Sequence, residues 1–182
     1  MKNIVFDYIK SDLFRYYGNT SFNNFIIALS FNRGFNFMFW FRIAQSEIFL
    51  LSNFAKLMVF LKRRSYKIDI PVQTRIGYGF YIGHGGPLVV NPTTTFGNNC
   101  NVSQFTSIGS NKNKAAEIGN NVYIGPNVCI IENVKISDNV TIGAGSVVTK
   151  DIPENATVVG NAAKILNYNT PGIFIHNKVK VN

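Results

Sequence analysis

Residues 118–148 read IGNNVYIGPNVCIIENVKISDNVTIGAGSVV, and this stretch repeats its pattern every six positions. The first position of each repeat is occupied in turn by Ile118, Ile124, Ile130, Ile136, Ile142 and Val148. The fourth position is asparagine in four repeats and Gly145 in the fifth. The fifth position is valine in four repeats and Ser146 in the last. Five consecutive matching hexads indicate a solenoid built from very short units.

Each position of the hexad has a physical interpretation. A β-branched residue at every sixth position suits a short strand whose side chain points into a narrow interior. Asparagine or glycine at a constant place marks a turn that needs positive φ, which these residues tolerate best. The small fifth residue fits inside beside the first. Three hexads therefore close one triangular coil of about 18 residues, and coils stack at about 4.8 Å. We predict a mainly β fold, a parallel β-helix.

The repeat extends toward the N-terminus but slips twice. Earlier hexads read IGYGFY at 76–81 and FGNNCN at 96–101. Val90 follows Ile82 by eight positions, and Ile118 follows Ile108 by ten, with SNKNKAAE between them. Insertions in a solenoid form loops, often on the binding face. We therefore expect chemistry near these two slips.

The part of the chain before the repeats follows another pattern. Residues 3–17 are predicted to form a helix that ends at Gly18, and Ser21 is the expected N-cap of a helix over 22–31. Asn32-Arg33-Gly34 is expected to be a turn. We predict an α-helical region at 1–68, the β-helix at 69–166 and a tail at 167–182.

Residues 35–62 form an apolar stretch long enough to cross a bilayer. Arg42, Glu47 and Lys56 interrupt it, which favours two amphipathic helices over a membrane span. A helix lying in the membrane interface, with Lys62, Arg63 and Arg64 as its cationic end, is the alternative.

Composition limits the class of protein. The chain has 182 residues, 46% of them hydrophobic and 15% charged, which excludes a disordered chain. The formal charge is +9, and residues 1–69 hold 10 Lys/Arg against 4 Asp/Glu. This surplus points to a membrane surface or an anionic ligand. Nucleic acid is not expected as a partner, because the sequence contains no known nucleic-acid motif.

The number of cysteines and the first residues of the sequence both bear on the location of the protein. Two cysteines cannot build a disulfide framework, and the first residues lack the apolar run of a signal peptide. We expect a cytoplasmic protein, with the inner face of the membrane as a further option. Cys100, in an inward column, is expected in the core, and Cys129 is expected to point outward.

His84 is the side chain best placed for catalysis. It lies in the first slip between Gly83, Gly85 and Gly86, and Asp69 precedes it by slightly less than one coil. An Asp–His pair suits acyl transfer to a hydroxyl, since imidazole removes the proton while the carboxylate orients it. N–H groups at Gly85 or Gly86 would stabilise the oxyanion. The other histidine, His176, lies in a tail with no pattern around it.

The segment DIPVQTRIGYGFYIGHGGPLVV and the closing stretch IGAGSVVTKDIPENATVVGNAAKIL resemble the hexapeptide-repeat acyltransferases. Within this family, the two segments are similar to serine acetyltransferases and to capsular or exopolysaccharide O-acetyltransferases. The resemblance implies a left-handed coil, a trimer or a dimer of trimers, and active sites between subunits. The family's catalytic histidine falls on His84 and its partner aspartate on Asp69.

The resemblance also implies acetyl-CoA as co-substrate. Backbone groups at Gly109, Gly125 and Ala144 would hold the pantetheine arm. Lys150 and Lys164 would pair with the phosphates of CoA. The alternative is that both are solvated surface cations. Lys112 and Lys114, in the second slip, would serve CoA or the acceptor.

Three departures from the family bear on the acceptor. The family's Asp-His pair reads Gly83-His84, its second histidine aligns with Ala115, and its long helical N-terminal domain is replaced by the basic, aromatic stretch 1–68. We therefore predict O-acetylation of a sugar hydroxyl in surface polysaccharide synthesis. Serine O-acetylation, sugar N-acetylation and a non-enzymatic scaffold are the alternatives. No metal site is expected, since a zinc site of the related carbonic anhydrases needs three histidines.

Overall fold

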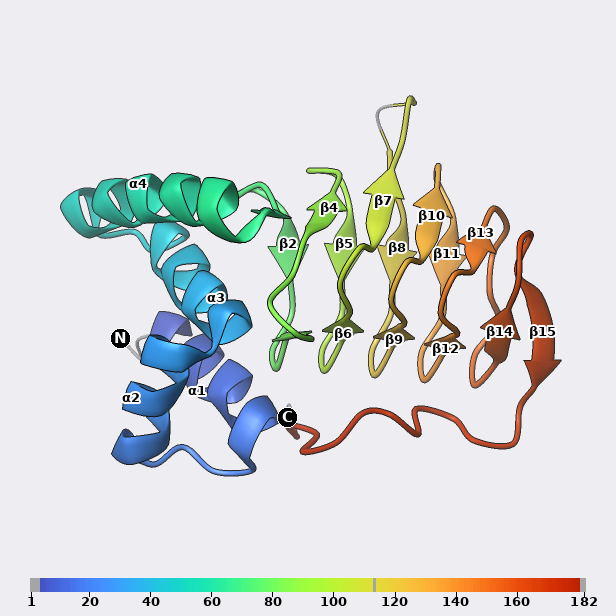
Figure 1. The fold of residues 1–182 in the computed structure, drawn as a ribbon, viewed down its shortest axis with the longest axis horizontal. Helices are drawn as coiled ribbons and strands as arrows, with labels where there is room; N and C mark the ends of the chain where they lie inside the picture. The colour runs from blue at the N-terminus through green and yellow to red at the C-terminus, as the bar shows by residue number, and fades with distance from the viewer. Residues whose placement is uncertain (1–3, 113, 181–182) are drawn as a thin grey trace.

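The computed structural model describes residues 4–112 and 114–180, which form a helical region followed by a stacked β-helix (Figure 1). The helices are α1 (Ile4–Tyr17), α2 (Phe22–Phe31), α3 (Arg33–Ala44) and α4 (Phe49–Tyr66). They gather at one end of the solenoid, and α4 leads directly into the first coil.

Three parallel sheets form the faces of the β-helix, and each coil contributes one strand to each face. The first sheet contains β1 (Ile68–Asp69), β4 (Leu88–Val90), β7 (Ser107–Gly109), β10 (Cys129–Ile131) and β13 (Val147–Val148). The second contains β2 (Arg75–Ile76), β5 (Thr95–Phe96), β8 (Glu117–Ile118) and β11 (Lys135–Ile136). The third contains β3 (Tyr81–Ile82), β6 (Asn101–Val102), β9 (Tyr123–Ile124), β12 (Thr141–Ile142), β14 (Thr157–Val159) and the antiparallel β15 (Lys164–Asn167).

The hexad pattern predicts the interior of this coil correctly. The first and fifth positions of the repeats point inward and are buried, including Ile124, Val128 and Ser146. Cys100 is buried as expected, whereas Cys129, expected to point outward, is half-buried. Tyr123 pairs with Thr141, which lies one predicted coil length further along the chain. The predicted fold class, a left-handed parallel β-helix with a helical N-terminal region, is confirmed.

The turn positions agree with the prediction at all but one repeat. Asn121, Asn127, Asn139 and Gly145 adopt positive φ. In the hexad at 130–135 the left-handed residue is Glu132 rather than the asparagine after it, so that assignment is wrong. Its carboxylate accepts hydrogen bonds from the Ser110 hydroxyl at 3.0 Å and the Asn111 N–H at 3.3 Å, which tie this corner to the neighbouring loop.

The apolar stretch at 35–62 forms two helices, as predicted, but the expected turn at Asn32-Arg33-Gly34 is wrong. Helix α3 begins at Arg33, and the Asn32 side chain caps it by accepting from the Phe35 N–H at 3.0 Å. Gly34 is needed there because a Cβ would lie 2.5 Å from the carbonyl oxygen of Ile82. No helix among residues 4–112 and 114–180 is long and apolar enough to cross a membrane.

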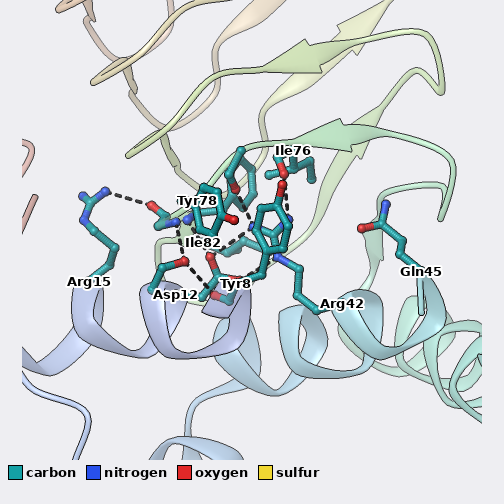
Figure 2. A network of polar contacts seen from close by, with 12 residues as sticks. Tyr8, Asp12, Arg15, Arg42, Gln45, Ile76, Tyr78 and Ile82 are labelled. Atoms are coloured by element: carbon teal, nitrogen blue, oxygen red, sulfur yellow. Dashed lines mark hydrogen bonds and ion pairs between the residues drawn. The ribbon is translucent and has the colours of Figure 1, made fainter. Parts of the chain in front are cut away.

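A buried polar network joins the helices to the first coils (Figure 2). The Arg42 guanidinium donates to both carboxylate oxygens of Asp12, at 2.9 and 3.1 Å, and to the carbonyls of Ile76 and Gly77. The Phe80 N–H donates to the same carboxylate at 2.8 Å. These bonds fix the helical region to one end of the β-helix.

The C-terminal segment, whose sequence shows no repeat pattern, is attached to the coils and to α1 by hydrogen bonds. Residues 168–180 run back along the coils to the helices (Figure 1). Their anchors are Gly172 N–H to the Asn139 carbonyl, Arg15 to the His176 carbonyl, and Asn99 with Val179 in both directions. His176 therefore takes part in this attachment through its backbone.

Candidate functional site

The first slip in the repeat is a two-residue bulge that carries His84. In the register between the first two coils, Ile82 pairs with Val102 and Val89 pairs with Ser107. The segment between Ile82 and Val89 is therefore two residues longer than the segment it stacks on. His84 and Gly85 are the inserted residues; both have positive φ, at 60° and 54°. The His84 side chain is exposed at the corner between the third and first sheets.

Gly85 and Gly86 have packing reasons to be glycine. A Cβ on Gly85 would lie 2.6 Å from the Cβ of Arg33, at the start of α3. A Cβ on Gly86 would lie 3.0 Å from the Cβ of Gln104 in the next coil. The bulge is therefore pressed against both α3 and the second coil, which supports the position of His84. The oxyanion role of these glycines stays a prediction.

Asp69 lies on β1, directly after α4, and is 45% exposed. Its carboxylate accepts a hydrogen bond from the Arg63 guanidinium of α4 and forms an ion pair with it. Asp69 pairs with Val89 in the first sheet, so it lies one coil below the strand that follows the His84 bulge. Within residues 4–112 and 114–180, no hydrogen bond or ion pair joins Asp69 to His84. The catalytic pair stays a prediction.

A pocket of about 600 Å³ opens beside Asp69. The end of α4 forms one wall, and the corner and strand residues of the first two coils form the other. Its lining includes Phe60, Arg63, Arg64, Lys67, Val89 and Phe105. The spacing of the repeat contained no signal for this pocket, because it arises where a helix meets the coils.

The second slip forms the loop between β7 and β8, at the opposite edge of the first sheet from His84. Because Val90 pairs with Ile108 but Thr95 pairs with Glu117, this loop is longer than the corner of the coil before it. Lys114 forms an exposed ion pair with Glu117 at 2.8 Å, and Lys112 is exposed. In one chain the structure therefore places these lysines and His84 on different corners.

The predicted cofactor glycines differ in their surroundings. A Cβ on Gly109 would meet nothing within 4 Å, so the coil leaves open space there. A Cβ on Gly125 would lie 2.8 Å from the carbonyl oxygen of Ile142, so stacking of coils requires this glycine. Ala144, Lys150 and Lys164 are all exposed toward the far end of the solenoid. Of the two predicted cofactor glycines, Gly109 is therefore the one with room beside it for a ligand.

Cys100 is not available as a nucleophile. Its thiol lies inside the coil, where burial raises the pKa to about 12. The buried thiol packs 3.1 Å from the carbonyl oxygen of Gly119. Among the described residues, no group of three or more His, Cys, Asp or Glu side chains is placed to hold a metal ion.

Comparisons with known proteins agree with this architecture. A family model described as bacterial transferase hexapeptide (six repeats) matches residues 115–150. A serine acetyltransferase of Synechococcus elongatus is 32% identical over 115 residues, covering 61% of this chain and 47% of that protein. The chain spans about half the length of this relative.

Solved structures share the fold. Neisseria gonorrhoeae serine acetyltransferase in complex with serine superposes with a TM-score of 0.78 at 28% identity, covering 91% of this chain and 70% of that chain. A Brucella abortus serine acetyltransferase in complex with coenzyme A has the same fold, with a TM-score of 0.73 at 24% identity, over 87% of this chain and 66% of that one. The hexad repeat, the family match and the shared fold are together consistent with the hexapeptide-repeat acyltransferase group.

Proposed function

We propose that this protein transfers an acetyl group from acetyl-CoA to a hydroxyl group. The observation that carries the proposal is the bulge at His84, which presents an exposed imidazole at a corner of a coil shared with serine acetyltransferases. In the reaction, the acceptor oxygen bonds to the acetyl carbonyl carbon and the carbon–sulfur bond breaks. The hydroxyl proton passes through His84 to the thiolate of CoA.

Serine is the first acceptor to test, because the similar proteins named above are serine acetyltransferases. This is better supported than the sugar acceptor predicted from sequence. Two features nevertheless favour a sugar hydroxyl as the second candidate. Gly83 leaves the position before His84 without a carboxylate. Ala115 is fully buried, with its N–H donating to the Thr93 hydroxyl at 2.9 Å, so it does not line an acceptor site.

Self-association is part of the proposal. His84 and the loop carrying Lys112 and Lys114 lie at opposite edges of the first sheet, so a neighbouring copy would bring its loop to the His84 of the first. The first sheet exposes Val89 and Ile131, and the adjoining corner exposes Phe105. Exposed apolar patches of this kind mark protein interfaces. A trimer would complete the site.

The test is replacement of His84 by alanine. We expect the rate of acetyl-CoA cleavage, measured as thiol release with serine and with a panel of sugars, to fall at least about a hundredfold. His176→Ala is the matched control, because it removes the chain's other histidine from the C-terminal segment. Equal rates in wild type and His84→Ala, with the far-UV circular dichroism unchanged, would refute the role of His84.

A further inference from the structure

Helix α4 presents apolar residues on two sides. Its inner side, which includes the buried Ser52, Ala55 and Val59, packs against α3. On the other side, large apolar residues recur at spacings of four, three and four positions, so they form one stripe along the helix. This outer stripe consists of Leu50, Phe54, Leu57 and Leu61, which are 48–80% exposed. A contiguous apolar surface that stays exposed marks a site of interaction.

The apolar surface continues from the outer stripe toward α2. The Phe54 ring lies 5.7 Å from the Trp40 ring of α3, and Trp40 lies 5.1 Å from Phe39, measured between ring centroids. Phe39 in turn lies 5.7 Å from Phe25 of α2. Helix α2 contains no charged residue, and Phe31 at its end is 84% exposed. An aromatic row therefore joins the exposed apolar surfaces of two helices.

The apolar stretch 35–62 divides into one helix that is covered and one that is not. Seven of the twelve residues of α3 are buried. In α4, three of the eighteen residues are buried. The alternative stated from the sequence, a helix lying in the membrane interface, can therefore apply to α4 but not to α3.

Exposed cations adjoin the outer stripe. Helix α4 contains four Lys/Arg and no acidic residue. Asp69 neutralises Arg63 through their ion pair. Among residues 4–112 and 114–180, Lys56 and Arg64 are exposed and form no ion pair. Arg64 follows Leu57 by seven positions, so it lies in line with the stripe.

Charge complementarity selects the partner of this surface. A second copy of α4 offers no carboxylate to these cations, so the pairing of two copies would gain nothing from them. Anionic phospholipids offer phosphate oxygens, and their surface potential attracts lysine and arginine. Below the headgroups, a bilayer also accepts leucine and phenylalanine side chains. A helix with an exposed apolar stripe and unpaired cations beside it therefore suits an anionic bilayer.

We propose that α4 binds the surface of an anionic phospholipid bilayer and lies in the plane of its interface. The outer stripe faces the acyl chains, and Lys56 and Arg64 contact the lipid phosphates. Their long aliphatic stems allow the charged groups to stay at the level of the headgroups. The inference does not rest on the proposed function, because α4 binds lipid whether or not His84 is catalytic.

Sedimentation of the full chain with phospholipid vesicles measures this binding. We expect vesicles that contain phosphatidylglycerol to bind at least about tenfold more tightly than vesicles of phosphatidylcholine alone, because each of the two exposed cations contributes about fivefold. Raising the salt concentration should weaken the binding, since salt screens charges at a surface. Equal binding to both kinds of vesicle would overturn the proposal.

Single substitutions separate the apolar contribution from the charged one. Leu57→Gln should weaken binding to anionic vesicles at least about tenfold, and Arg64→Gln about fivefold. Leu50→Gln repeats the apolar test at a side chain that is 80% exposed, where folding is not at risk. The matched controls are Ile165→Gln on β15 and Lys135→Gln on β11, which are exposed on the solenoid away from the helices (Figure 1). Losses no larger than those of the controls would contradict the assignment to α4.

Trp40 provides an internal probe of the contact. It is the single tryptophan of the chain, and it lies against Phe54 of the outer stripe. We expect brominated phosphatidylcholine in anionic vesicles to quench its fluorescence in the wild type and in Ile165→Gln, and much less in Leu57→Gln. Fluorescence that brominated lipid leaves unchanged in the wild type would place the membrane contact elsewhere and overturn the proposal.

The other possible occupant of the outer stripe is a second copy of the chain. Analytical ultracentrifugation without vesicles compares the wild type with Leu57→Gln, whose circular dichroism should be the same. A smaller assembly in Leu57→Gln would assign the stripe to a contact between copies and overturn the proposal, whereas an unchanged assembly supports the bilayer. None of these measurements uses acetyl-CoA, so their failure leaves the proposed function standing.

Discussion

The buried pair of Asp12 and Arg42 holds the junction between helices and coils together. Both side chains are almost fully buried. Burial raises the pKa of Asp12, and the adjacent guanidinium of Arg42 opposes this shift. Arg42 also satisfies two carbonyl groups of the first coil. Removing one partner leaves a buried charge without compensation, which is far more costly than losing a surface ion pair.

Replacing Arg42 by methionine should therefore lower the free energy of unfolding by about 3–5 kcal/mol, because Asp12 then stays buried without its partner. Chemical denaturation followed by circular dichroism measures this change. The double variant Asp12→Leu with Arg42→Met should recover part of the loss. An exposed control, Lys10→Met, is expected to change stability by less than about 0.5 kcal/mol. A loss of that small size in Arg42→Met would contradict the assignment.

The thiol of Cys100 should resist alkylation in the native protein. With its pKa raised to about 12 by burial, only about one thiol in 10⁴ is ionised at pH 8, and the thiolate is the reactive form. In the Cys129→Ser variant, iodoacetamide at pH 8 should label no thiol until the chain is unfolded. Because the raised pKa favours the neutral thiol, moving from pH 8 to pH 9 should not produce rapid labelling. Rapid native labelling of that variant would show that Cys100 is exposed.

Among the elements, the corners of the coils are held by left-handed residues that stack in register. The Asn121 amide donates to the Asn139 side-chain oxygen at 2.9 Å, and Asn139 donates to Asn155 at 3.0 Å. All three residues have positive φ. The ladder links successive coils at one corner, so each asparagine serves both the turn and the stacking.

A pair of substitutions separates the turn from the ladder. Asn121→Ala and Asn121→Gly both remove the side-chain bond, but only alanine is strained at a φ of 54°. The alanine variant should therefore be about 1 kcal/mol less stable than the glycine variant. Asn133 is not among the residues with positive φ, so alanine is not strained there. At this position the glycine variant should be less stable than the alanine variant, because glycine increases the chain entropy of the unfolded state. Thermal denaturation of the four variants checks both orders.

At the scale of the whole molecule, the two slips in the repeat lie at the two corners that border the first sheet. The first sheet exposes Ile131, and its neighbouring corners carry His84 and the loop of Lys112 and Lys114. A neighbouring copy packed on this sheet would bring the loop of one chain to the histidine of another. Peripheral membrane association through the basic helical region stays a prediction.

Ile131→Glu should weaken this self-association, because it places a charge on the apolar first sheet. Analytical ultracentrifugation should show a trimer for the wild type and mainly monomer for the variant at the same concentration. Ile165→Glu is the control, since Ile165 is equally apolar and exposed but lies on the third sheet. A trimer that persists in Ile131→Glu would place the interface elsewhere.

The β-helix, its inward columns and the two places where the coil bulges could all be predicted from the amino-acid sequence. These features are local, because each hexad meets its neighbours at a constant spacing that can be read along the chain. The same spacing singled out His84, whose catalytic role stays a prediction.

The contacts of the helices and of the C-terminal segment with the coils could be identified only from the three-dimensional structure. The end of α4 reaches the first sheet, Arg63 binds Asp69, and Arg64, Lys67 and Phe105 come to line one pocket. The return of the C-terminal segment to α1 is likewise absent from the repeat pattern. Such contacts join a non-repeating helix or tail to the coils, so the periodicity of the sequence cannot predict them. They also depend on how the buried pair of Asp12 and Arg42 orients the helices against the solenoid.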